Sequence, residues 1–433
     1  MTALADSLLR SSRTQRLLIE LTSKCNLRCT YCAVAQPGYE GIQFPIEHFE
    51  ALTKLIVDRA PEIVMINGHG ETTIVKDWDV YVRHWLDLGL NLEIITNLSK
   101  KLKDTEIETL ARLRRVTIST DSSVPELFEA LRRNAKWEIF DSNLTRLMEA
   151  IARNEKETVL TFSCVVSDIC APKLEEFADY GLARGVRYFE FCNLAKYPDV
   201  EGAQPVRHLS ELPRDERDQL AQSTRRMLEK LRAHGVQFAW PEALAQTLGM
   251  TVPTEAEVPQ KHPKKTIREI VAARAVHTGE HAVDEPSTES SSTHSIDDGA
   301  AGAQRTHVET KVAIEPTDEV DAPLGVQGEV RTVYPSRKAS SDVQAMTRRC
   351  LDPWSFAYLQ ADTAVRICCF MTETVGHLGT GESLDQILNA EKVVEIREGL
   401  LSGNPIEACR NCWARPWVPV SELEADVRAW TQV

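Results

Sequence analysis

The chain has 433 residues, of which 42% are hydrophobic and 26% are charged, as is ordinary for a globular protein of two or three domains. Its formal net charge of −14 argues against a nucleic-acid groove as the main partner surface, and no apolar run approaches the roughly 20 residues that a membrane span needs. The first residues lack the positive and apolar segments of a secretory signal, so we expect a cytoplasmic location.

Residues 1–15 form a short, polar segment, and we expect a tail or a lead-in helix there. From 16 to 245, six apolar runs alternate with longer amphipathic runs. The runs of strand length lie at 17–21, 62–67, 92–97, 114–120, 158–166 and 186–193. We expect helices near 46–59, 77–88, 105–113, 143–154, 172–185 and 211–235. This alternation predicts an α/β fold with a parallel sheet, whose functional site lies at the carboxyl ends of the strands.

Three cysteines directly follow the first expected strand. Cys25, Cys29 and Cys32 have the spacing C-x3-C-x2-C, and Tyr31 precedes the last of them. Thiolates suit iron–sulfur clusters, and three of them leave one iron of a four-iron cube open to another molecule. Part of a zinc site or three unrelated buried thiols are the alternatives. The eleven cysteines are an odd number in clustered spacings, which is typical of metal ligands in a reducing compartment.

The motif resembles the signature of the radical S-adenosylmethionine (radical SAM) superfamily, with Tyr31 as the usual aromatic residue. The resemblance implies a partial (β/α)6 barrel of the TIM type, in which the three cysteines bind a [4Fe–4S] cluster and SAM chelates the open iron. One electron, from a donor such as flavodoxin or ferredoxin, then cleaves SAM to a radical that abstracts a hydrogen atom from the substrate.

Polar residues at the ends of the other strands resemble the SAM pocket of this family. Gly70 and Glu71 resemble the Gly-Gly-Glu motif that holds the SAM amino group, although His69 and Thr72 replace the usual Gly and Pro. The further candidates, each at or next to a strand end, are Thr96, Asn97, Ser119, Asp121 and Asn193. Turns and helix N-caps favour the same residue types, so a purely structural role is the alternative. The remaining cysteines of this region, Cys164, Cys170 and Cys192, have no ligand spacing, and Cys164 and Cys192 are expected in the core because they lie in apolar strands.

Residues 246–345 are expected to be a largely disordered insert or linker. Glu, Pro, Ser, Thr, Ala and Gly dominate it, and Tyr334 is its only aromatic residue. Such a segment buries too little apolar surface to offset the entropy of its chain. A run at 266–276 has the composition of a short helix.

A second group of cysteines lies in residues 346–433. Cys409 and Cys412 have the chelating spacing C-x2-C, and Cys350 with one of Cys368 and Cys369 would complete four ligands. The segment resembles the auxiliary-cluster module called Twitch, a shortened SPASM domain, and the usual distance from the first cysteine favours Cys368.

The count of cysteines decides how many auxiliary clusters we expect. A full SPASM domain with two clusters needs seven or more cysteines, and this segment has five. We therefore expect one [4Fe–4S] cluster with four thiolates and no open iron. Thr363 stands where the pattern usually has Gly, and a structural zinc site is the alternative.

A closed cluster near the substrate is suited to accept an electron. The resemblance to single-auxiliary-cluster enzymes therefore implies dehydrogenation of a small polar metabolite, such as a sugar or cyclitol alcohol. Radical modification of a ribosomal peptide or protein, by crosslinking, oxidation or epimerisation, is the nearest alternative, and a carbon–carbon lyase is another. A non-catalytic iron–sulfur or zinc scaffold is a third class. The sequence singles out no catalytic base.

Overall fold

The computed structural model describes residues 8–10, 13–154, 158–195, 205–251, 345–379, 381–412 and 414–431. The insert expected at 246–345, including the helix considered for 266–276, therefore lies almost entirely outside the described residues. Within those residues, no helix has the length and apolar character to cross a membrane.

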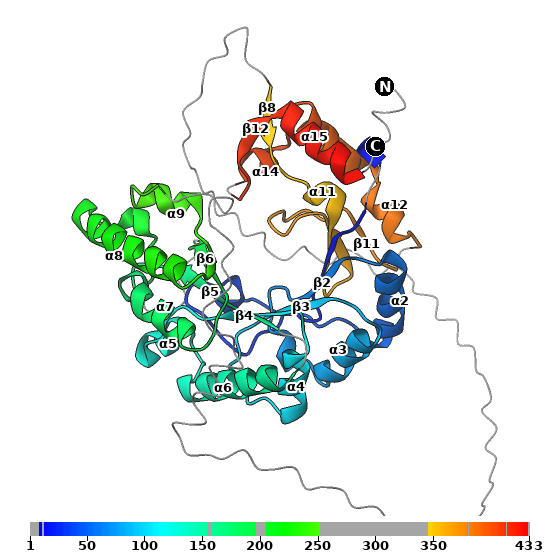
Figure 1. The fold of residues 1–433 in the computed structure, drawn as a ribbon. Helices are drawn as coiled ribbons and strands as arrows, with labels where there is room; N and C mark the ends of the chain where they lie inside the picture. Colours follow the sequence, from blue (N-terminus) through cyan, green and yellow to red (C-terminus); the bar gives the residue numbers. More distant parts are fainter. Residues whose placement is uncertain are drawn as a thin grey trace, which may run out of the picture. The chain divides into compact units, whose positions relative to one another are not determined.

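A mostly parallel sheet organises the described chain (Figure 1), and its order is β11-β10-β9-β1-β2-β3-β4-β5-β6-β7. The six strands that the sequence predicts are present as β1 (Arg16–Ile19), β2 (Ile63–Ile66), β3 (Leu92–Thr96), β4 (Arg115–Ser119), β5 (Val159–Val166) and β6 (Tyr188–Asn193). They pair in parallel and in chain order. β7 (Gln237–Ala239) adds a further parallel strand beside β6.

Helices connect the strands of this sheet. The six expected helices correspond to α2 (Phe49–Arg59), α3 (Trp78–Asp87), α4 (Asp104–Ala111), α6 (Trp137–Arg153), α7 (Leu174–Leu182) and α8 (Arg214–Ala233). The sequence analysis missed α5 (Pro125–Leu131) and α9 (Glu242–Thr247). Short 3-10 helices occur at η1 (Ala33–Ala35), η2 (Ile46–His48), η3 (Thr72–Ile74), η4 (Ala171–Lys173) and η5 (Leu209–Glu211).

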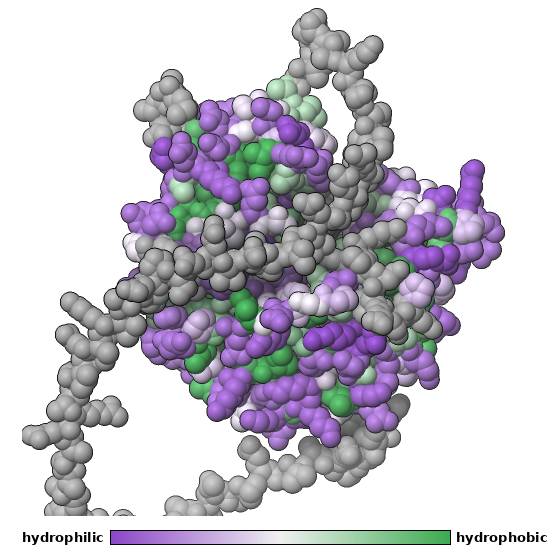
Figure 2. All heavy atoms as spheres, turned by 180° about the vertical axis from the view of Figure 1, so that it is seen from behind, coloured by the Kyte–Doolittle hydropathy of each residue, from purple (hydrophilic) through white to green (hydrophobic). Residues whose placement is uncertain are grey.

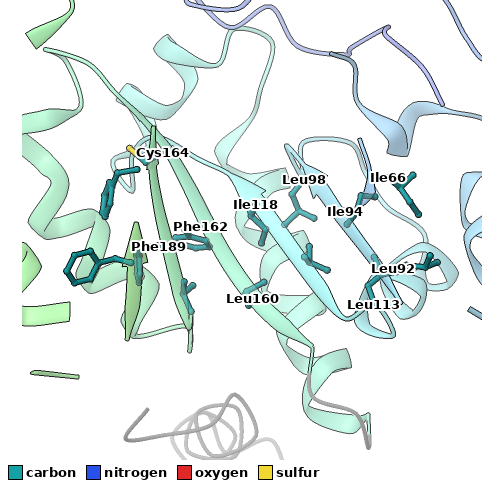
Figure 3. Packing of buried hydrophobic residues seen from close by; sticks show 14 of the residues in the cluster. Ile66, Leu92, Ile94, Leu98, Leu113, Ile118, Leu160, Phe162, Cys164 and Phe189 are labelled. Carbon is teal, nitrogen blue, oxygen red and sulfur yellow. The ribbon is translucent and has the colours of Figure 1, made fainter. Parts of the chain in front are cut away.

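Alternate residues along the strands pack against the helices. Ile118, Phe162 and Phe189 stand in register on β4, β5 and β6, and all three are fully buried (Figure 3). Cys164, two residues further along β5, is also fully buried, as the sequence predicts for a core position. The residues between them, such as Thr117 and Thr161, form a polar row on the other face.

The C-terminal residues continue the same sheet. β9 (Phe356–Leu359) pairs in parallel with β1, and β10 (Ala364–Arg366) and β11 (Gly376–His377) extend it as antiparallel strands. A separate two-stranded sheet joins β8 (Met346–Arg348) to β12 (Trp417–Pro419). The helices of this part are α11 (Asp352–Ser355), α12 (Leu384–Leu388), α13 (Glu391–Leu401), α14 (Glu407–Arg410) and α15 (Val420–Thr431). The predicted auxiliary-cluster module is thus joined to the predicted barrel through backbone hydrogen bonds.

Residues 8–10 are helical, with Leu8 and Leu9 buried, which fits the lead-in helix rather than the tail among the two alternatives for residues 1–15. Leu8 and Leu9 are about 95% buried; their carbonyls accept hydrogen bonds from Trp354 Nε1 at 2.8 Å and from Arg397 Nη1 at 2.7 Å. Two leucines are too short a run to show a periodicity, so the sequence pattern could not predict their burial against residues far away in the sequence.

The described surface seen in Figure 2 is largely hydrophilic, with smaller apolar areas between polar residues.

Candidate active site

The loop from Cys25 to Cys32 follows β1 at its carboxyl end. Its backbone is held by the C-terminal end of α5 and the residues after it: the N–H of Arg28 donates to the carbonyl of Arg133, and the N–H of Thr30 donates to that of Leu131, both at 3.0 Å. Cys29 is buried and the other two thiols are half-buried. The loop brings the three thiols near enough to act on one another electrostatically.

The surroundings of these thiols fit metal-bound thiolates. Burial raises the pKa of Cys25 to about 11 and that of Cys29 to about 12, so bound cations would be needed to hold both as thiolates. The N–H of Leu27 points to Cys25 Sγ at 3.4 Å, and the side-chain amide of Asn97 lies 3.7 Å from it. Hydrogen bonds to sulfur of this kind are typical of iron–sulfur sites. No three His, Cys, Asp or Glu side chains in the described ranges are arranged around a single-ion position.

The glycine-rich motif after β2 is packed directly against the cysteine loop. A Cβ atom on Gly70 would lie 2.2 Å from the carbonyl oxygen of Lys24, so only glycine allows this approach. The N–H of Glu71 donates to the same carbonyl at 2.8 Å. At His69, the backbone N–H donates to Glu20 Oε1 at 2.6 Å while the side chain is exposed. Because this contact uses the backbone, the structure accommodates a histidine where the related motif has glycine.

Glu71 joins the ends of β2 and β3. Its buried carboxylate accepts hydrogen bonds from Thr96 Oγ1 at 2.8 Å and from the N–H of Asn97 at 2.7 Å. Burial raises the pKa of Glu71, and the hydrogen bonds oppose that shift. The Asn97 amide in turn donates to Asn26 Oδ1 at 2.9 Å, inside the cysteine loop. The structure therefore brings Glu71, Thr96 and Asn97 together beside Cys25, and their contacts with SAM remain a prediction.

Asp121 forms a buried ion pair that the sequence analysis did not foresee. Arg132 Nε lies 2.9 Å from Asp121 Oδ2, and both side chains are at least 94% buried. The Tyr31 hydroxyl donates to Oδ2, and the N–H of Val165 donates to Oδ1 at 2.9 Å. Both oxygens of Asp121 are thus engaged within the protein. Arg132 also lowers the thiol pKa of Cys25, Cys29 and Cys32 against the larger effect of burial.

Two further predicted pocket residues lie at their expected strand ends. Ser119 is the last residue of β4, half-buried and in register with Ser163 of β5. Asn193 is the last residue of β6, and its Oδ1 lies 2.7 Å from Nε2 of His208. Asn193 is therefore already partnered within the protein, whereas no hydrogen bond to another described residue defines the role of the Ser119 side chain.

The second group of cysteines lines one cavity. Cys350, Cys368, Cys409 and Cys412 all border it, and it encloses about 440 Å³ of empty space, including space open to solvent. Apolar side chains of Pro353, Phe370, Met371, Ile396 and Ala408 complete much of the wall. Four thiols around one partly buried space match the donor set of a [4Fe–4S] cluster.

Cys368 and Cys369 are adjacent in sequence but differ in position. Cys368 borders the cavity and is half-buried, whereas Cys369 is exposed. A hydrogen bond from the Cys369 thiol lowers the pKa of Cys368 to about 7, and the N–H of Phe370 lies 3.3 Å from Cys368 Sγ. This geometry favours Cys368 as the ligand, in line with the sequence-based preference.

Comparison with known proteins identifies two domains. The model of the radical SAM superfamily matches residues 19–181, and the SPASM iron–sulfur cluster-binding domain matches residues 350–413. A GTP 3',8-cyclase of Nautilia profundicola is 31% identical over 198 residues, and a probable GTP 3',8-cyclase of Methanocaldococcus jannaschii is 26% identical over 171. These matches cover 42% and 37% of this chain and 58% and 54% of the relatives, so the chain spans just over half the length of either relative.

A solved structure shares the fold. Streptococcus suis SuiB bound to precursor peptide SuiA matches with a TM-score of 0.52 and 12% identity, over 91% of this chain and 68% of that one. The radical SAM domain binds SAM and a [4Fe–4S] cluster, and the SPASM domain binds an auxiliary iron–sulfur cluster. The chain therefore carries a radical SAM domain and, at its C-terminal end, a SPASM iron–sulfur domain.

Proposed function

We propose that this radical SAM enzyme removes two electrons from a small polar metabolite, such as a sugar or cyclitol alcohol, and that its auxiliary cluster accepts one of them. The cavity bordered by Cys350, Cys368, Cys409 and Cys412 carries the proposal. Four thiolates would occupy every iron of one cube, which leaves no iron for substrate. A closed cluster is suited to electron transfer, as in the shortened, Twitch-like form of the SPASM domain.

The residues of the first site would hold the reactants in place. Cys25, Cys29 and Cys32 would ligate the cluster whose bound SAM supplies hydrogen-atom abstraction. Gly70 would let the backbone approach SAM, because it already brings the motif against the cysteine loop. Glu71 would keep this motif and Asn97 in one arrangement through its four hydrogen bonds.

The proposed oxidation balances without a further oxidant. The carbinol carbon loses a hydrogen atom to the SAM-derived radical, the hydroxyl loses a proton to a base, and the remaining electron passes to the auxiliary cluster. A C–H and an O–H bond break, and a carbonyl forms. We propose flavodoxin or ferredoxin as donor of the electron that starts the reaction, which fits a cytoplasmic enzyme.

The test begins with anaerobic reconstitution with iron and sulfide. With SAM and dithionite, we expect 5′-deoxyadenosine by mass spectrometry, and none from the Cys29→Ala variant. A panel of sugars and aminocyclitols deuterated at each carbinol carbon should then yield deuterated 5′-deoxyadenosine from the true substrate. If Cys409→Ala retained full product formation, the auxiliary cluster would not be the electron acceptor.

A purine nucleotide is a second candidate substrate, because the chain is 31% identical to a GTP 3',8-cyclase over 198 residues. Adding GTP to the same assay tests this, since a substrate stimulates formation of 5′-deoxyadenosine and is itself consumed. A peptide is a third candidate, because SuiB, which shares the fold, was solved with a precursor peptide. Consumption of neither GTP nor peptide, together with deuterium transfer from an alcohol, would favour the first proposal.

A further inference from the structure

An ion pair borders the auxiliary cavity. Arg415, which lines the cavity, places Nη2 2.8 Å from Oδ1 and 3.0 Å from Oδ2 of Asp352. Asp352 is the first residue of α11 and lies two positions after Cys350. The Asp352 side chain is 17% exposed and that of Arg415 is 37% exposed, so solvent screens the pair only in part.

The two charges act on the cavity thiols with opposite sign. Asp352 raises the pKa of the Cys350 thiol and Arg415 lowers it, although burial has the larger effect. The influence of Asp352 also extends to Cys368 and Cys409. Both charges therefore lie within electrostatic reach of the proposed ligands, and at Cys350 they act in opposite directions.

We propose that the Asp352–Arg415 pair sets the reduction potential of the auxiliary cluster, by holding a positive and a negative charge in balance beside its thiolate ligands. Hydrogen bonds, net charge and solvent exposure are the means by which proteins adjust such potentials. This inference rests on the auxiliary cluster of the proposed function but on neither the substrate nor the reaction. Asp352 and Arg415 are positioning residues here, since they act through the cluster.

The sign of each effect follows from charge. Reduction adds one electron to the cluster, so a nearby positive charge favours the reduced form and a negative charge opposes it. In Asp352→Asn, the Arg415 charge is no longer balanced, and the potential should rise. In Arg415→Gln, the Asp352 charge is no longer balanced, and the potential should fall. In the double variant both charges are gone, and the potential should return near that of the parent protein.

Arg348, which also lines the cavity, has a structural role. Arg348 donates to the carbonyls of Cys409 at 3.3 Å, Arg410 at 2.6 Å and Arg415 at 2.7 Å. It therefore fixes the backbone of the segment that carries Cys409 and Cys412. Replacing Arg348 would disturb the ligands themselves, which makes it unsuitable for testing charge alone.

The chain offers a matched control pair. Arg349 precedes Cys350, and its Nε lies 2.8 Å from Oδ2 of Asp426. The Arg349 side chain is 52% exposed and does not border the cavity. Because water screens exposed charges, Asp426→Asn should leave the potential unchanged.

The experiment is an anaerobic potentiometric titration of the reconstituted full chain, followed by electron paramagnetic resonance. The signal that changes when SAM is added belongs to the first cluster and serves as an internal reference. For the other signal, we expect each single variant to change the reduction equilibrium constant on the order of tenfold, which is 59 mV for one electron, in opposite directions.

Iron content is measured on every variant so that loss of the cluster is recognised. Should a neutral substitution cost the cluster, Asp352→Glu and Arg415→Lys keep the charges and should keep both cluster and potential. Unchanged potentials in both single variants, or shifts of the same sign, would overturn the inference. Opposite shifts would support it even if the alcohol, nucleotide and peptide assays all failed, so the two proposals fail separately.

Discussion

The carboxylate of Glu20 accepts a hydrogen bond from the N–H of Ala361 at 3.3 Å, across 341 positions of sequence. Its other oxygen accepts from the N–H of His69 at 2.6 Å. Glu20 follows β1 directly, and Ala361 lies in the turn between β9 and β10. One buried carboxylate thus ties the glycine-rich motif of the first site to the C-terminal module.

Replacing Glu20 by Gln should destabilise the protein. Glutamine offers one acceptor oxygen and an NH2 group, so one of the two backbone N–H groups would face a donor. Leaving a buried donor unpaired costs about 1–3 kcal/mol of unfolding free energy, which denaturant titration of the cluster-free protein would measure. Glu176→Gln, on the exposed face of α7, is the control and should change it by less than about 0.5 kcal/mol. Equal effects of the two substitutions would contradict this role of Glu20.

Gly70→Ala should abolish SAM cleavage. The added Cβ would lie 2.2 Å from the Lys24 carbonyl and 2.5 Å from that of Thr22, so the motif and the cysteine loop would have to separate. The measurement is 5′-deoxyadenosine formation together with SAM binding. His69→Ala is the matched control, because the contact with Glu20 uses the backbone N–H, and it should retain at least half of the parent rate. Loss of activity in both variants would show that the histidine side chain has a role of its own.

Cys368→Ser and Cys369→Ser should separate the ligand from its neighbour. Cys368 borders the four-thiol cavity and Cys369 does not. We expect Cys368→Ser to lose the auxiliary cluster, seen as about half of the iron per chain if both sites hold four irons. Cys369→Ser should keep the iron of the parent protein. The reverse pattern would make Cys369 the ligand.

Arg132→Met should destabilise the protein strongly. It leaves the Asp121 carboxylate buried without its cation, and breaking a buried ion pair from one side costs about 3–5 kcal/mol. Arg153→Met is the control, since the ion pair of Arg153 with Glu108 is exposed and is expected to contribute less than about 1 kcal/mol. Chemical denaturation of both cluster-free variants provides the comparison. A cost below about 1 kcal/mol for Arg132→Met would mean that Asp121 finds another partner.

Much of the barrel was predictable because its strands are local, β-branched runs. All six expected strands lie within two residues of their predicted ends at either side, and the parallel order followed from their alternation with helices. β7 was missed because three residues are too few to show a pattern. The pairing of β9 with β1 was not predictable, since nothing in either strand alone specifies a neighbour so far away in sequence.

The residues of the candidate sites were likewise predictable only in part. The cysteine spacings identify both groups of thiols, and the structure places each group together. Arg132 has no motif around it, so only the fold reveals that it lies beside Asp121. The internal partners of Asp121 and Asn193 could not be predicted either, because a strand-end residue has the same sequence signature whether it faces SAM or a neighbouring side chain.

The pairing of β9 with β1 also determines when the main sheet can be completed during synthesis of the chain. β1 precedes β9 by most of the described sheet, and in the described residues one of the two edges of β1 is covered by β9, which the ribosome makes much later. Until then, Leu17, Leu18 and Ile19 belong to an open sheet edge, and such edges are templates for pairing between chains. A chain ended before residue 356 would keep that edge, and we expect it to aggregate during expression.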